Sequence, residues 1–102
     1  MNADQSDEYE GPALNWLVRE VTRMNSCLLE ARVNSQEQRR TACDAYFFGL
    51  GVGLDEPVNV NGRSYLPVIA LATADGRLLL PTELFDFHEF APSIVGEAFG
   101  EL

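Results

Sequence analysis

The sequence has no lysine, one histidine and two cysteines among its 102 residues. The glycine-rich string GLGVGLDE at residues 49–56 lacks the Gly-Lys-Ser/Thr of a phosphate-binding loop, so we expect no nucleotide site there. Two cysteines and one histidine are too few, at too wide a spacing, for a zinc site. The sequence therefore predicts neither a cofactor nor a metal.

The sequence also lacks an apolar run that could span a membrane, and its acidic start does not resemble a secretory signal peptide. Cys27 and Cys43 are therefore expected to be reduced, buried thiols of a cytoplasmic protein. A nucleophilic Cys–His pair would need one of them beside His88, the single histidine. Both cysteines fall on apolar faces of expected helices, where a thiol is inert, so we expect the protein not to be an enzyme.

Basic residues are scarce, because seven arginines stand against 16 acidic residues and leave a net charge of −9. A nucleic-acid-binding domain or one that docks on anionic membranes would carry an excess of cations. We therefore expect no direct contact with either. The acidity favours a basic protein partner. The alternative is that the acidity only maintains solubility.

A chain of this length forms one domain. Residues 1–10 are polar and acidic and are expected to form a disordered tail. Residues 11–102 are expected to form a single α+β domain. Its predicted order is an N-terminal helical hairpin, a three-stranded antiparallel β-meander, and one or two short C-terminal helices.

Spacings of three and four residues predict an amphipathic first helix. Its apolar positions are Leu14, Leu17, Val21, Met24, Leu28 and Ala31. This seam is expected to face the protein's own core, and a homodimer through residues 14–31 is the alternative. Ser35 followed by Gln38 fits a capping box and predicts a second helix that ends near Leu50 at the glycines. One uninterrupted helix over residues 12–50 is the alternative.

Two turn signals, Asn61-Gly62 and Asp75-Gly76, divide the next apolar stretch. They predict a meander of strands at residues 58–60, 63–73 and 77–80. Because both faces of the middle strand are apolar, we expect that strand to be central or covered on both sides. Pro67 is expected at a bulge or where pairing ends.

The segment at residues 83–90 interleaves carboxylates with phenylalanines, which suits an arginine-rich protein surface. The predicted partner-binding residues are Asp75, Glu83, Phe85, Asp86 and Glu89. The expected function is a small acidic protein-binding module that blocks or modulates a larger basic protein, one that could itself handle nucleic acid, in the manner of a phage-encoded inhibitor or an immunity protein. The alternatives are a secretion chaperone or adaptor and, less favoured, a small ligand-binding domain or enzyme.

Overall fold

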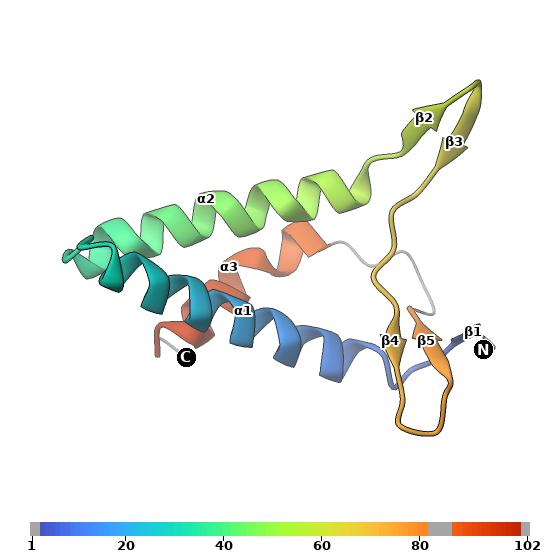
Figure 1. Ribbon diagram of the computed structural model, residues 1–102, viewed down its shortest axis with the longest axis horizontal. Helices are drawn as coiled ribbons and strands as arrows, with labels where there is room; N and C mark the ends of the chain where they lie inside the picture. Colours follow the sequence, from blue (N-terminus) through green and yellow to red (C-terminus); the bar gives the residue numbers. More distant parts are fainter. Residues whose placement is uncertain (1–2, 82–86, 101–102) are drawn as a thin grey trace.

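The computed structural model describes residues 3–81 and 87–100 and has an α+β fold. Three helices make one part of the molecule, and short strands lie at and beyond one end of them (Figure 1). The element order is β1, α1, α2, β2, β3, β4, β5, α3. Over the described residues, none of the helices is both long and apolar enough to cross a membrane.

Helices α1 (Glu10–Glu30) and α2 (Gln36–Asp55) form the predicted hairpin. Ser35 caps α2, because its hydroxyl accepts a hydrogen bond from the backbone N–H of Gln38 at 3.2 Å. The alternative of one continuous helix is therefore wrong. On α1, the residues Ala13, Leu17 and Val21 are buried at spacings of four.

Arg39 joins the two helices and the loop at the loop end of this hairpin through hydrogen bonds. Its Nε donates to Asn25 Oδ1 of α1 at 2.7 Å, and its Nη1 donates to the carbonyl of Val33 in the loop at 2.8 Å. The side chain is buried. A guanidinium offers several fixed donors, so one residue can satisfy both acceptors.

Helix α2 continues five residues beyond its predicted end, through Gly49, Gly51 and Gly53 to Asp55. Gly51 is the position that requires glycine. A Cβ added there would lie 2.5 Å from the backbone nitrogen of His88 and 2.6 Å from its Cα. A Cβ at Gly49 or Gly53 would meet nothing within 4 Å. Gly51 therefore forms the notch into which the start of α3 fits.

Helix α3 (Phe87–Ala98) packs along α2 and, less extensively, along α1. It is one continuous helix with Pro92 inside it, where the sequence left open one helix or two. The three helices enclose the main core. Its buried members are Leu17, Val21, Cys43, Phe47, Phe87, Ala91, Ile94 and Val95.

The predicted three-stranded meander is wrong. Strands β2 (Val58–Val60) and β3 (Arg63–Tyr65) form a separate antiparallel hairpin. Strand β4 (Leu71–Ala72) pairs instead with β5 (Leu78–Leu80). Residues 66–70 have no strand assignment, so the long middle strand is divided just before Pro67, where pairing was expected to end.

Strand β1 (Ala3–Gln5) lies parallel to β5 and completes a three-stranded sheet in the order β1-β5-β4. This differs from the disordered tail expected over residues 1–10. Tyr9, between β1 and α1, is only 1% exposed. Its ring packs with Ala13 and Leu79, and Leu71 packs against them. This small cluster lies apart from the helical core.

Candidate functional site

The single histidine lies beside a carboxylate. Nδ1 of His88, at the start of α3, contacts Oδ2 of Asp55, the last residue of α2. The ring of Phe48 lies edge-on to the imidazole, with the ring centroids 6.0 Å apart. Among the described residues, no group of three histidine, cysteine or acidic side chains could hold a metal ion. The Asp55–His88 pair joins two helix ends.

The two cysteines lie in different surroundings. Cys43 is buried in the helical core, and burial raises the pKa of its thiol above the ordinary value. A buried, protonated thiol is a poor nucleophile. Cys27 is exposed on α1, and its predicted burial is therefore wrong. His88 contacts Asp55 and the ring of Phe48.

Of the predicted partner-binding residues, Asp75 lies in the exposed turn between β4 and β5. Its carboxylate accepts a hydrogen bond from the Thr73 hydroxyl and lies 3.3 Å from Nε of Arg77. The Thr73 hydroxyl, followed by the charge of Arg77, holds the pKa of Asp75 below its ordinary value. This carboxylate already has partners within its own turn.

The remaining predicted contacts are only partly described. Glu89 is exposed on α3, in a different element from Asp75. Glu83, Phe85 and Asp86 lie outside the described residues. Phe87, in the same segment, is buried in the helical core.

The β2–β3 hairpin, called the arm below, projects from the end of α2 (Figure 1). The sequence predicted its turn and pairing but placed it in a covered meander, and so missed that the hairpin stands alone. Every residue of both strands is exposed. The register pairs Val58 with Tyr65 and Val60 with Arg63, so these four side chains share one face. The pair Asn59 and Ser64 lies on the other face. The arm therefore has one face that is apolar apart from Arg63 and one polar face.

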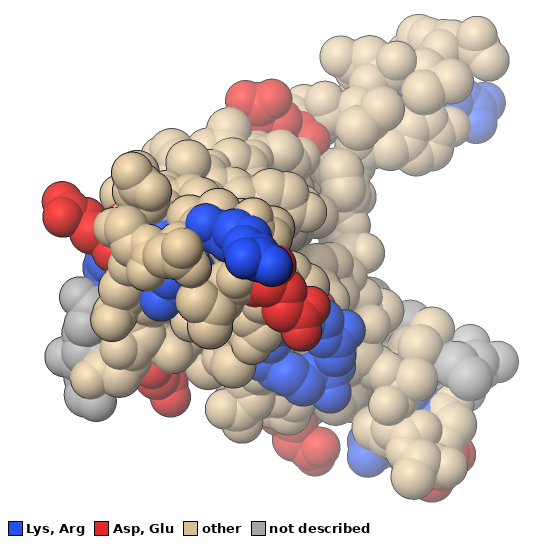
Figure 2. All heavy atoms as spheres, turned by 60° about the vertical axis from the view of Figure 1, so that its left-hand side comes forward, with Lys and Arg blue, Asp and Glu red and all other residues tan. Residues whose placement is uncertain are grey.

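The apolar character continues into the segment that returns from the arm to β4. The exposed fractions are 49% for Val58, 50% for Val60, 53% for Tyr65, 45% for Leu66 and 52% for Val68. Residues 57–74 carry one charged side chain, Arg63. Figure 2 accordingly shows the arm almost entirely tan, whereas blue and red groups mix over the helical end. Scattered exposed apolar residues are ordinary, but a contiguous group usually marks an interaction site.

A signal for the arm was present in the sequence. Asn61 and Gly62 have φ of 52° and 78°, as a type I′ hairpin turn requires. The turn was therefore recognised correctly. The apolar residues after it were assigned to a core because a buried strand and an uncovered apolar strand have the same residue pattern.

A second apolar surface lies between α1 and α2. This groove has a volume of about 450 Å³. Its lining comes from one stripe of α1 and from the middle of α2: Trp16, Glu20, Arg23, Met24, Cys27, Tyr46, Phe47 and Leu50. Leu17 and Val21 of the same helix are buried in the chain's own core, as the seam at residues 14–31 predicted. The groove uses the neighbouring stripe and shares Met24 with the seam.

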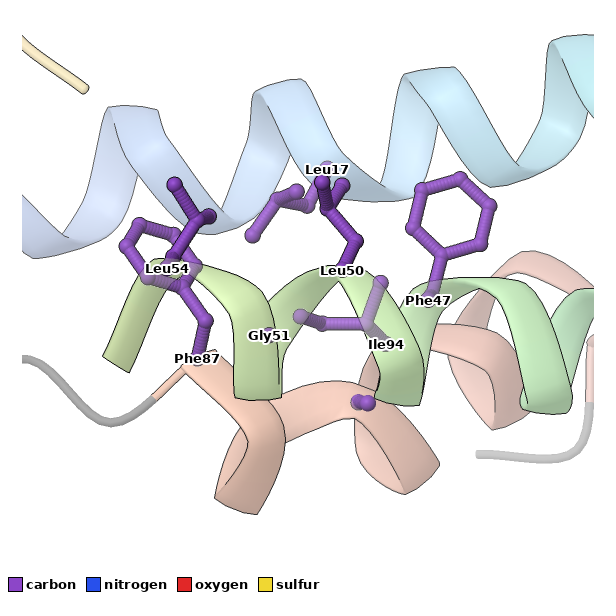
Figure 3. Close-up of a pocket in the computed structure, with 8 residues that line it drawn as sticks. Leu17, Phe47, Leu50, Gly51, Leu54, Phe87 and Ile94 are labelled. Atoms are coloured by element: carbon purple, nitrogen blue, oxygen red, sulfur yellow. The ribbon is translucent and has the colours of Figure 1, made fainter. Parts of the chain in front are cut away.

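The space among the three helices is a packing cavity. Leu17 of α1, Leu50 and Leu54 of α2, and Ile94 of α3 converge on it (Figure 3). Its volume is about 10 Å³. A water needs about 10–15 Å³ and two to four polar partners, which this apolar lining does not offer. The cavity is part of the core and has no room for a ligand.

Comparisons with protein-family models, with curated proteins and with solved structures give no match to this chain.

Proposed function

We propose that this protein is a small acidic protein-binding module that blocks or modulates a larger basic protein, and that the arm is its docking element. The observation that carries the proposal is the uncovered apolar face of the arm and of the segment that follows it. An isolated two-stranded hairpin is at best marginally stable in water. Covering its apolar face with a partner would stabilise it through burial, at about 25 cal/mol per Å².

The shape of the molecule supports this proposal. The Cα radius of gyration is 15.5 Å, whereas a compact domain of 100 residues has about 13 Å. The arm contributes to this extension, since it projects from the helices without a buried residue of its own. An element that extends from a folded body can enter a cleft on another protein.

Charge supports a basic partner. Residues 57–74 carry a single charge, the +1 of Arg63. The rest of the chain therefore carries a formal −10, which together give the net charge of −9. Such a field steers a positively charged protein toward the molecule, while the arm supplies the contact. Under this proposal the acidic residues act on the rate of encounter. They include Asp75 and Glu89 and, from the sequence alone, Glu83 and Asp86, with Phe85 as a proposed apolar contact.

Site-specific photo-cross-linking in the native host tests the docking element. A photoreactive residue at position 58, on the apolar face, should cross-link to one partner. The same residue at position 59, on the polar face, should not. Equal cross-linking from both positions, or none from position 58, would contradict the proposal.

The partner captured in this way allows a quantitative test. Val58→Ser with Tyr65→Ser removes the apolar face, and Asn59→Ala with Ser64→Ala is the matched control on the other face. The first pair should weaken binding at least tenfold, the equivalent of about 1.4 kcal/mol, and the control should not. Association with the wild type should slow as salt rises, because screening reduces electrostatic steering.

The groove between α1 and α2 favours a second candidate, a chaperone or adaptor that holds an amphipathic segment of its client. Met24 and Tyr46 would then be the contact residues. Binding in an apolar groove depends little on salt. The same cross-linker at position 46, with salt-independent capture of a client, would favour this function over docking through the arm.

A further inference from the structure

The arm is attached to the body at two roots. At the first root, α2 ends at Asp55, and Glu56 and Pro57 lead into β2. The Asp55–His88 contact ties this helix end to α3. At the second root, residues 66–70 lead back to β4, and Ile69 packs against the helical core.

Between these roots, the arm has little contact with the body. Every residue from Val58 to Val60 and from Arg63 to Tyr65 is exposed. The orientation of the arm is therefore determined at its roots. The first root is fixed by a helix end. The second is a short segment without strand pairing, so its position depends on individual contacts.

One of these contacts comes from Tyr9, near the N-terminus. The Tyr9 hydroxyl donates a hydrogen bond of 2.5 Å to the carbonyl oxygen of Ile69, 60 residues away. Tyr9 is itself held in place, because its N–H donates to Ser6 O at 3.1 Å and the N–H of Ser6 donates to Leu80 O at 3.0 Å. The ring is buried between Ala13 and Leu79.

The hydroxyl has no packing role that a phenylalanine ring could not fill. A buried tyrosine hydroxyl is retained with a partner, because leaving it unsatisfied costs free energy. Burial also raises the pKa of Tyr9, so the group stays a hydrogen-bond donor. Its acceptor is a backbone carbonyl of the return segment, and this bond therefore constrains the path of the main chain.

We infer that the Tyr9 hydroxyl, through its hydrogen bond to Ile69, fixes the second root of the arm and thereby the arm's orientation. With the hydrogen bond to Ile69 in place, the arm keeps one position relative to the helices. Without the bond, the return segment is released and the arm swings about Glu56 and Pro57. The N-terminal segment thus controls the presentation of the arm. This inference concerns position alone and holds whether or not the arm binds the proposed partner.

The distance between the arm and α1 tests the inference. Spin labels on the exposed native Cys27 and on Ser64→Cys report this distance by pulsed electron resonance, while buried Cys43 stays unlabelled. With Tyr9 present, one narrow distance peak is expected. Tyr9→Phe should lose this single peak in favour of a broad distribution and should speed amide exchange at residues 69–71. Helical circular dichroism should stay unchanged.

Two further variants separate the hydrogen bond from other effects. Tyr65→Phe removes a hydroxyl on the exposed face of the arm, opposite the label, and should keep the narrow peak. Tyr9→4-aminophenylalanine restores a donor on the same ring and should recover it. A narrow peak in Tyr9→Phe would overturn the inference. A broad peak in both variants of Tyr9 would also overturn it, because ring packing would then be the cause.

Discussion

The helical core and the arm contain the same apolar residue types, but the core buries them and the arm exposes them. Val21 and Val95 are completely buried between helices, whereas Val58 and Val60 of the arm, and Val68 in the segment after it, are about half exposed. The helices form layers that cover one another, and the arm is a single hairpin with no second layer. The helical part covers its apolar surface internally, whereas the apolar surface of the arm stays exposed.

The first test of this difference shortens one apolar side chain in the helical core and one on the arm. Leu17→Ala, in the helical core, should lower the free energy of unfolding by about 2–5 kcal/mol through lost burial and a residual cavity. Val60→Ala, on the arm, should change it by less than about 0.5 kcal/mol. Urea denaturation followed by circular dichroism measures both. Similar losses in the two variants would place the arm inside the stable core.

The glycines of α2 sharpen the comparison within one helix. Gly51→Ala brings a Cβ against the backbone of His88, so α3 must shift, and we expect a loss of about 1–3 kcal/mol. Gly53→Ala meets nothing and should stabilise by about 0.4–1 kcal/mol through a less flexible unfolded chain. Thermal unfolding of both variants measures the contrast. Stabilisation by Gly51→Ala would show that α3 does not need the notch.

Arg39 tests whether the helical end depends on a polar contact. Arg39→Ala leaves Asn25 and the Val33 carbonyl without their donor, at a cost of about 1–3 kcal/mol. Arg19→Ala is the control, because that exposed side chain lies 3.7 Å from Glu20 and should contribute less than about 0.5 kcal/mol. Denaturant midpoints report both changes. Equal effects would show that the hydrogen bonds of Arg39 contribute no more to stability than an exposed ion pair.

The smallest expected effect is the pH dependence that comes from Tyr9. Its pKa is raised by burial above the ordinary value of 10.0, so the folded state holds this proton more tightly than the unfolded chain. The resulting contribution is fully present below pH 10.0 and is lost as pH rises from there through the folded pKa. Urea midpoints in alkaline buffers measure this loss. Tyr9→Phe should lose less stability over the same range.

The helices could be predicted because their signals are local. The spacing of apolar residues on α1 and the cap at Ser35 need no knowledge of the rest of the fold. The end of α2 could not be predicted in this way. Glycine disfavours a helix locally, and the close approach of α3 at Gly51 outweighs that preference only in the folded protein.

The candidate site was harder to predict than the fold. The turn at Asn61 and Gly62 was visible, but the covering of an apolar strand depends on what lies above it. The division before Pro67 leaves β2 and β3 without a third strand and turns an expected core into exposed surface. Similarly, Tyr9 fell in a segment judged by its acidic composition, which does not show that one aromatic ring is buried.

The position of α3 in the chain has a consequence for synthesis on the ribosome. Helices α1 and α2 enclose their core only with α3, whose last residue, Ala98, comes 43 residues after the end of α2 at Asp55. At about 5–20 residues per second, the helical hairpin waits roughly 2–9 s for the complete third helix. During that interval Val21, Cys43 and Phe47 face solvent or whatever is nearby in the cell. A nascent chain stalled before residue 87 should therefore be recognised by chaperones, whereas the released full-length chain should not.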